Sequence, residues 1–261
     1  MAAKRGSCVL QSALVVIALS LPDLPAHAKY GGGAGEPNDP YLIYTAEQIN
    51  AIGVEPNDWG GHFKLMADID LGIYTGTTFN IIGQGWNADG APRPFRGVFD
   101  GNDHTISHFT WTSTGKVCVG LFGFVGDPNA QIKNLRLVDV SVDGGNGHSI
   151  GALVGTLANG TIVNCRATGN VNGEMYVGGL IGDHSGRLVN CHTDGVVRGT
   201  TWIGGLIGYS GHGSITACYS NSSVTGSTWV GGLAGYINGE HTTSCYATGS
   251  VAGVNHVGGL A

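Results

Sequence analysis

The chain has 261 residues, of which only 11% are charged, and its formal net charge is −6. This composition excludes a highly charged disordered chain, and the lack of a Lys/Arg cluster argues against nucleic acid as a partner. Glycine occurs 47 times. Because the glycines lack the G-X-Y period of collagen, we expect them to serve turns and tight corners.

The first 28 residues have the pattern of a secretory signal peptide. Lys4 and Arg5 precede the apolar run VLQSALVVIALSL, and AHA at residues 26–28 fits an A-x-A cleavage site. We therefore expect a secreted or surface-displayed protein whose mature chain begins near Lys29. A membrane anchor is the weaker interpretation, because this run is shorter than the roughly 20 residues that cross a bilayer. No later segment reads as a transmembrane span.

Residues 29–115 are predicted to form an N-terminal cap and the first irregular rungs of a repeat structure. Residues 41–43 predict a strand, and residues 45–53 predict one short helix. Thr45 is the expected N-cap, with Gln48 at capping-box spacing, and Gly53 is expected to end the helix in a left-handed conformation. The stretches HFKLMADIDL, FNIIG, FRGVFDG, HTISHFTW and QIKNLRLVDVSV predict further strands.

Residues 116–261 are organised by a repeat of 26 or 27 residues. The block VGGLIG and its variants IGGLIG and VGGLAG recur at this period. The same spacing separates four cysteines, Cys165, Cys191, Cys218 and Cys245. A fixed period of this size marks a repeat architecture. A phosphate-binding loop would be needed once and would precede a helix, whereas no helical pattern follows any copy, so the glycines are interpreted as architectural.

Within each repeat, the positions after the cysteine alternate between small or apolar residues and mixed residues, which is typical of strands. Each unit is expected to hold three short strands, and only stacked units can bury their apolar faces. The predicted fold is therefore all-β. It is a parallel β-helix, or β-solenoid, with 26–27-residue rungs and the right-handed connection usual for parallel strands. The N-terminal cap would cover the open edge of the first rung.

The four repeated cysteines are predicted to form a structural thiol ladder. Strands stacked in register lie about 4.8 Å apart, which exceeds the roughly 3.8 Å between the Cβ atoms of a disulfide. Cysteine would then act as a small buried hydrophobe. A disulfide between neighbouring rungs is the alternative. A metal site is disfavoured, because the repeated cysteines lack a C-x-x-C pairing.

The glycine blocks and the following N/A-C-Y/H/R-A/T/S-T/D-G segments resemble GLUG-motif repeats. The upstream segments DPYLIYTAEQINAIG, HFKLMADIDL, FRGVFDGNDHTISHF and VGLFGFVGDPNAQIKNLRLVDVSV resemble the region that often precedes them, except that His108 replaces the usual asparagine. The resemblance implies a secreted bacterial protein. It is similar to repeat regions of filamentous-haemagglutinin-like adhesins and to the non-catalytic N-terminal part of bacterial immunoglobulin A metallopeptidases. It marks an architecture, and fold alone does not imply activity.

Candidate catalytic and metal-binding groups are few. The H-E-x-x-H motif of zinc peptidases is absent, and His104 and His108 offer only a conceivable metal pair. Asp68 and Asp70 share a strand face and are weak candidates for Ca²⁺, together with Asp100 and Asp103. The same carboxylates are the candidates for a glycosidase pair, but closing turns is the simpler role for them. We expect no metal, no cofactor and no catalytic residue.

One outward column of side chains suggests binding. The residue before each V/I-G-G block is aromatic or histidine, at Tyr176, Trp202, Trp229 and His256. Stacked aromatic residues stabilise neighbouring strands, which is the structural interpretation. The functional interpretation is a flat platform for a sugar or a partner protein. Tyr219 and Tyr246 predict a second short stripe.

The sequence thus favours a secreted or surface-displayed structural or adhesive β-solenoid without catalytic activity, with a cell-surface glycan or protein as its ligand. The alternatives are the non-catalytic N-terminal part of a larger secreted enzyme and a carbohydrate-active β-helix. A solenoid needs a terminal cap for solubility, and none is visible after the interrupted last repeat. We therefore expect either that the sequence is a fragment that continues into a missing C-terminal region, or that another chain covers this edge.

Overall fold

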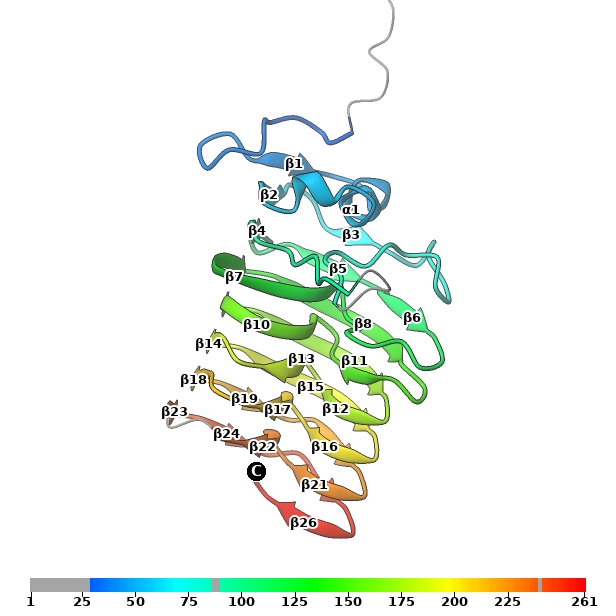
Figure 1. Ribbon diagram of the computed structural model, residues 1–261, viewed down its shortest axis with the longest axis vertical. Coiled ribbons are helices and arrows are strands. Elements are labelled where there is room, and N and C mark those ends of the chain that lie inside the picture. Colours follow the sequence, from blue (N-terminus) through cyan, green and yellow to red (C-terminus); the bar gives the residue numbers. More distant parts are fainter. Residues whose placement is uncertain (1–28, 86–89, 239–240) are drawn as a thin grey trace, which may run out of the picture.

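A computed structural model describes residues 29–85, 90–238 and 241–261. The predicted signal peptide lies outside these residues. The described chain winds into a parallel β-solenoid whose rungs stack along the long axis of the molecule, with helix α1 at the N-terminal end (Figure 1). Every pairing between two named strands is parallel. The predicted all-β solenoid with one short helix is confirmed.

Three sheets form the walls of the solenoid. The first contains β1 (Tyr41–Ile43), β2 (His62–Leu65), β4 (Val98–Asp100), β7 (Phe122–Lys133), β10 (Val154–Val163), β13 (Ile181–His184), β14 (Arg187–Val189), β17 (Ile207–Ser210), β18 (Ser214–Thr216), β22 (Ala234–Ile237) and β23 (His241–Thr243). The second contains β3 (Ile69–Asp70), β5 (Thr105–Ser107), β6 (Thr110–Thr112), β8 (Arg136–Asp143), β11 (Arg166–Asn172), β15 (His192–Arg198), β19 (Tyr219–Ser220), β20 (Ser223–Thr225), β24 (Tyr246–Ala247) and β25 (Val251–Ala252). The third contains β9 (His148–Ile150), β12 (Met175–Gly178), β16 (Thr201–Gly204), β21 (Thr228–Gly231) and β26 (Asn255–Gly258).

The N-terminal helix α1 spans Ala46–Gly53 and begins with the predicted capping box, in which the Gln48 backbone N–H donates to the Thr45 hydroxyl. The predicted role of Gly53 is wrong. Gly53 is the last residue of the helix, and the C-cap is Val54, which has an ordinary right-handed conformation. Glycine is needed there because a Cβ atom would lie 1.9 Å from the Asn80 carbonyl oxygen. A 3₁₀ turn, η1 (Pro56–Asp58), follows.

The glycine block forms a corner rather than the centre of a strand. Strand β12 ends at Gly178 and β13 begins at Ile181, so the repeat from β12 to β15 contributes four strands instead of the expected three. The next two repeats contribute five strands each, because two short strands replace β15. The corner brings backbones from neighbouring rungs very close together. A Cβ atom on Gly205 would lie 2.2 Å from the Gly232 carbonyl oxygen of the next rung. No side chain larger than hydrogen fits at such a distance, which explains the repeated glycine pair.

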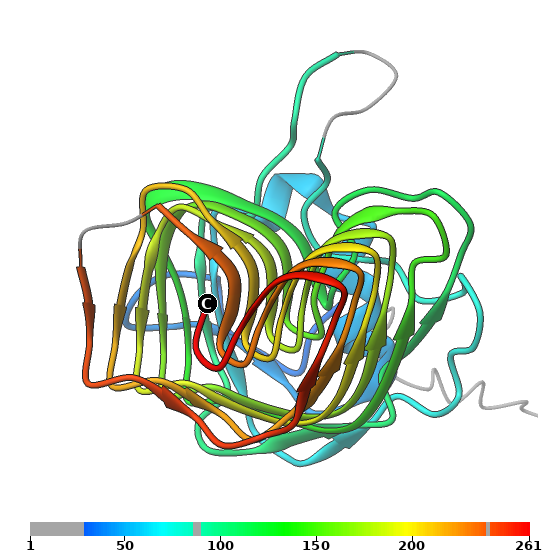
Figure 2. The same cartoon turned by 90° about the horizontal axis from the view of Figure 1, so that it is seen from below.

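The types of side chain that fill the core differ between the N-terminal end and the repeats. Near the N-terminal end the core is aromatic, with the Phe99 and Phe122 rings in edge contact at 5.3 Å and Phe63 stacked on Phe99. In the repeats the core is made of valine, leucine, isoleucine and cysteine. The rungs overlie one another when viewed along the axis (Figure 2), so each repeated inward position forms a column. The predicted alternation holds, since Cys165, Ala167 and Val171 are buried while Arg166 is exposed.

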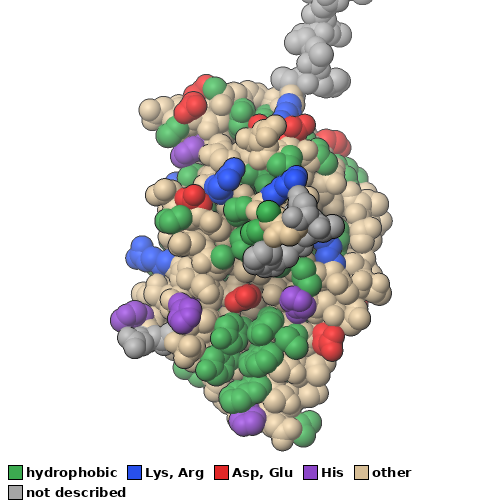
Figure 3. Space-filling model, in the orientation of Figure 1, with side chains coloured by type: hydrophobic (Ala, Val, Ile, Leu, Met, Phe, Trp, Pro, Cys, Tyr) green, Lys and Arg blue, Asp and Glu red, His purple; other side chains and the backbone are tan. Residues whose placement is uncertain are grey.

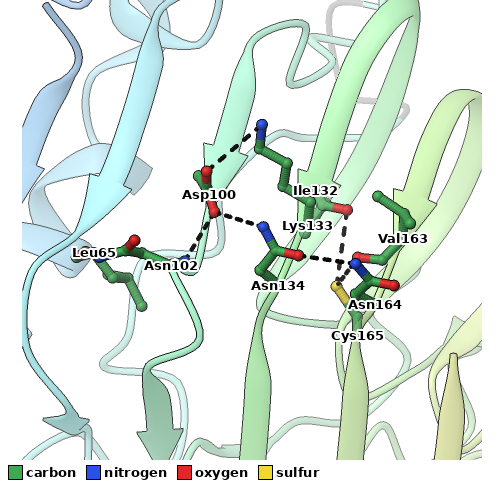
Figure 4. A network of polar contacts seen from close by, with 9 residues as sticks. All are labelled: Leu65, Asp100, Asn102, Ile132, Lys133, Asn134, Val163, Asn164 and Cys165. Atoms are coloured by element: carbon green, nitrogen blue, oxygen red, sulfur yellow. Dashed lines mark hydrogen bonds and ion pairs between the residues drawn. The ribbon is translucent and has the colours of Figure 1, made fainter. Parts of the chain in front are cut away.

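The corner between the first two sheets carries a ladder of asparagines (Figure 4). Asn134 donates to the Asp100 carboxylate at 3.1 Å, Asn164 donates to Asn134 at 3.1 Å, and Asn190 donates to Asn164 at 2.8 Å. All three asparagines have φ between 51° and 55°, a left-handed conformation that asparagine tolerates well. The ladder stops at Ala217, which keeps the same left-handed φ of 53°.

Candidate functional site

The four predicted ligand-binding residues occupy a bulge in the third sheet. The ladder pairs Met175 with Thr201 and Val177 with Ile203, which leaves Tyr176 and Trp202 outside the pairing. Their φ values are 53° and 59°, and Trp229 and His256 have 58° and 52°. None of these four side chains is buried, as expected from the inward direction of Val177 and Ile203. Two earlier rungs place Cys118 and Ser149 in the same left-handed conformation.

The bulge side chains form two stacked pairs. The Tyr176 and Trp202 rings lie 4.9 Å apart with an interplanar angle of 13°, and Trp229 and His256 lie 4.0 Å apart at 9°. Two tyrosines of the first sheet, Tyr209 and Tyr236, stack on each other at 5.2 Å. They meet the indoles edge-on, Tyr209 at Trp202 and Tyr236 at Trp229. We call these six residues the aromatic patch; apolar side chains gather over β16, β17 and β22 in Figure 3.

The aromatic patch differs from a flat platform. Stacked rings cover parts of one another's faces, so the surface presents ring edges as well as faces. The described residues contain no hydrogen-bond partner for the indole N–H groups of Trp202 and Trp229 or for the hydroxyls of Tyr176, Tyr209 and Tyr236. The arrangement therefore combines apolar rings with polar groups that are free to bind a ligand, as aromatic residues at interfaces commonly do.

Tyr209 and Tyr236 were missed from the sequence, although a signal for them exists. They occupy one repeat position in IGDH, IGYS and AGYI, where Asp183 is the first member. The register pairs Asp183 with Tyr209 and Tyr209 with Tyr236. Asp183 therefore lies at the margin of the aromatic patch, half-buried, and burial raises the pKa of its carboxyl group.

The four repeated cysteines stack in register and are free thiols. Each backbone N–H donates to the sulfur of the next rung at 3.4 Å, from Cys165 to Cys191, from Cys191 to Cys218, and from Cys218 to Cys245. Burial raises the pKa of the Cys191 thiol well above its usual value. The Cys191 thiol is therefore a poor nucleophile, because the thiolate is the reactive form.

The weak metal candidates lie in two Asp–His pairs. Asp68 lies 3.2 Å from the Nδ1 atom of His104, and Asp70 lies 2.8 Å from the Nδ1 atom of His108. Asp70 also accepts the Gly72 backbone N–H, as a turn-closing carboxylate does. Within residues 29–85, 90–238 and 241–261 no three His, Cys, Asp or Glu side chains converge in a way that could hold a metal ion. Asp100 accepts hydrogen bonds from Asn102 and Asn134 instead.

Comparison with known proteins identifies the repeat. Residues 146–172 match the family model of the GLUG motif. This match covers the whole of β9, β10 and β11, which is about one rung. The predicted resemblance to GLUG-motif repeats is thereby confirmed for this rung. Similarity to adhesin repeats stays a prediction.

Two relatives and one solved structure share this type of sequence or fold. Halomucin of Haloquadratum walsbyi is 37% identical over 154 residues, and a protein of Evansella cellulosilytica proposed to be a Gly-rich membrane protein is 35% identical over 130 residues. The matches span 58% and 48% of this chain but only 2% and 14% of those proteins. A crystal structure from Bacteroides ovatus, of a protein proposed to be an immunoglobulin A1 protease, superposes with a TM-score of 0.59.

The Bacteroides ovatus structure covers 89% of this chain and 88% of its own, at 18% sequence identity, and so shows a shared fold. Among the described residues, no helix is long and apolar enough to cross a membrane. The solenoid, one rung of which matches the GLUG motif, thus places an aromatic patch on one face, next to a half-buried carboxylate.

Proposed function

We propose that the chain is a non-catalytic binding module of a secreted or surface-displayed protein, and that the aromatic patch contacts its ligand, a cell-surface glycan or protein. The observation that carries this proposal is the placement of rings at left-handed positions. Asparagine and glycine are the residues suited to positive φ, and a bulky residue there is strained. Such strain costs of order 1–3 kcal/mol per residue and clusters at functional sites.

Ring stacking offsets part of this cost, because an aromatic pair contributes about 0.5–1.5 kcal/mol. Stacking alone does not account for the composition of the patch. Trp202 and Trp229 occupy adjacent rungs, yet each stacks with a different neighbour, Tyr176 or His256. Their indole N–H groups stay free of partners in the described chain. Tryptophan and tyrosine dominate binding energy at interfaces, which supports a contact surface.

The test removes the indoles and measures binding. The double variant Trp202→Ala/Trp229→Ala is expected to lose binding on a printed glycan array or on a panel of immobilised extracellular proteins, while its circular dichroism spectrum is unchanged. The control Ile73→Ser/Val254→Ser removes two other exposed apolar side chains, 64% and 78% exposed, and should bind like the wild type. The proposal fails if the wild type binds none of these probes, or if the double variant binds equally well.

A second candidate function is the non-catalytic front part of a larger secreted enzyme. It is favoured by the shared fold with a protein proposed to be an immunoglobulin A1 protease. The intact mass of the native protein recovered from producing cells distinguishes the two. A mass equal to that of residues 29–261 supports the free binding module, whereas a much larger mass supports the longer enzyme.

A further inference from the structure

A second column of side chains follows the asparagine corner. The corner sequences are NLR (134–136), NCR (164–166), NCH (190–192), ACY (217–219) and SCY (244–246). The third residue of each is paired in register with the next, in the order Arg136, Arg166, His192, Tyr219 and Tyr246. We call these five residues the corner column. It belongs to the second sheet, whereas the aromatic patch belongs to the third and first sheets.

The first two members of the corner column are positive charges that face each other. Arg136 and Arg166 are both exposed and lie directly opposite each other on β8 and β11. Like charges in this relation destabilise a sheet. Neither arginine has an ion-pair partner in the described part of the chain, although hydrogen bonds from Thr105 and His104, and more weakly the charge of Arg136, lower the pKa of the Asp68 carboxyl. The fold therefore carries a repulsive pair that a bound anion would neutralise.

These arginines share a hollow with hydrogen-bonding groups. A cavity of about 210 Å³ is lined by Asp103, Arg136, Asn164, Cys165, Arg166, Asn190 and His192. Asp103 and nearby Asp68 are the acidic groups here, and Asp68 is already bound by His104 and the Thr105 backbone N–H. A guanidinium group holds a carboxylate or sulfate through two parallel hydrogen bonds. The hollow is thus suited to an anionic substituent on a larger ligand.

The column continues as a stack of rings. His192 and Tyr219 lie 4.6 Å apart at 5°, and Tyr219 and Tyr246 lie 5.0 Å apart at 1°. The hydroxyls of both tyrosines have no hydrogen-bond partner among the described residues. Donors therefore repeat once per rung, about 4.8 Å apart, first on cationic groups and then on phenols. A ligand that fits this order is linear, with acidic groups and hydroxyl groups at short intervals.

We propose that the corner column binds a linear acidic polysaccharide. Its carboxylate or sulfate groups would lie at Arg136 and Arg166, and its hydroxyl groups would bind along Tyr219 and Tyr246. A nucleic acid or an acidic peptide fits less well. An acidic peptide lacks the hydroxyl groups that the phenols of Tyr219 and Tyr246 suit, and a nucleic acid offers few of them.

The experiment measures binding by biolayer interferometry to immobilised polygalacturonate and chondroitin sulfate, with dextran as the neutral polymer and poly-glutamate as the acidic peptide. The double variant Arg136→Ala/Arg166→Ala should weaken polysaccharide binding at least about tenfold, since each charge-assisted hydrogen bond is worth more than 1 kcal/mol. Arg136→Lys/Arg166→Lys should restore only part of the affinity, because lysine keeps the charge but lacks the planar fork.

The matched control is Arg187→Ala/Arg198→Ala, which removes the same two charges from exposed positions on β14 and β15 outside the column. It should retain binding within about twofold. Neither double variant should lower the melting temperature below that of the wild type, which reports an intact fold. Equal losses in the two double variants, stronger binding to poly-glutamate than to the polysaccharides, or no binding to either acidic polymer would overturn the proposal. Binding to the aromatic patch is read out separately by the tryptophan variants.

Discussion

The buried side chain of His184 is expected to make this solenoid sensitive to acid. His184 is fully buried, between Leu157 on the preceding rung and Ser210 on the following rung. Its Nδ1 atom lies 3.0 Å from the Ser210 hydroxyl, and its Nε2 atom has no partner in the described structure. Burial lowers the pKa of this imidazole to about 4. The folded state therefore holds His184 neutral well below neutral pH.

We predict that the free energy of unfolding decreases as the pH falls from 6.5 towards 4. In this range His184 of the unfolded chain, with a pKa of 6.5, binds a proton, whereas His184 of the folded chain does not bind one until about pH 4. The unfolded state is therefore favoured progressively, and the loss at pH 4 amounts to about 3 kcal/mol. Urea denaturation at pH 7 and pH 4.5 measures the difference.

The variant His184→Leu should lose most of this pH dependence, because leucine carries no proton and matches Leu157 on the preceding rung. His241→Leu, at an exposed histidine, is the control and should retain it. Parallel decreases for all three proteins between pH 7 and pH 4.5 would show that His184 is not the responsible group.

At the scale of elements, the corner between the third and first sheets depends on the absence of a side chain. Gly205 and Gly259 occupy the same repeat position, but their surroundings differ. A Cβ atom on Gly205 would meet the Gly232 carbonyl oxygen at 2.2 Å, whereas a Cβ atom on Gly259 would meet nothing within 4 Å. Substitution of these two glycines therefore distinguishes two reasons for glycine at this position. One is close contact with the neighbouring rung, and the other is the backbone conformation of the turn.

We predict that Gly205→Ala destabilises the protein by about 1–3 kcal/mol, the usual cost of overpacking, while Gly259→Ala changes stability by less than about 0.5 kcal/mol. Thermal unfolding of the two variants provides the comparison. Similar destabilisation by both would mean that the turn itself, rather than contact with the neighbouring rung, requires glycine.

The period of the sequence was sufficient to predict the rungs, because successive side chains along a strand alternate between two faces and the repeated cysteines fix the register. It did not reveal the corner after Gly178, since a strand and a sharp bend share the same local pattern. The left-handed bulge at Tyr176 was hidden for a related reason, because an aromatic residue is not a signal for positive φ. The contact of Tyr209 with Trp202 depends on packing between two sheets, which repeat spacing alone does not specify.

For the molecule as a whole, the thiol ladder reports how stability varies along the solenoid. Cys165, Cys191 and Cys218 are at most 1% exposed, whereas Cys245 in the last described rung is partly exposed. Repeat proteins open locally, with interfaces between neighbouring units contributing most of the stability. The four cysteines therefore sample the same position in four successive environments.

We predict that iodoacetamide at pH 8 modifies Cys245 of the native protein first, and that Cys191 and Cys218 react only on opening of the fold. Burial raises the pKa of the Cys191 thiol, and a contact with Cys191 together with burial raises the pKa of Cys218, so few reactive thiolates are present. Peptide mass spectrometry over time gives the order. Simultaneous modification of the four cysteines would indicate a single all-or-none opening instead.

The outward corner positions have a consequence for how such a protein changes over generations. A side chain at the left-handed bulge or in the corner column takes no part in the buried core, so replacing it alters the surface while the backbone path stays the same. Duplication of one 27-residue segment adds one side chain to each column and one increment of length. One repeat is thus both the segment that duplication adds and the unit that presents side chains to a ligand. Gain or loss of a repeat would therefore change the length of polymer that the protein can contact.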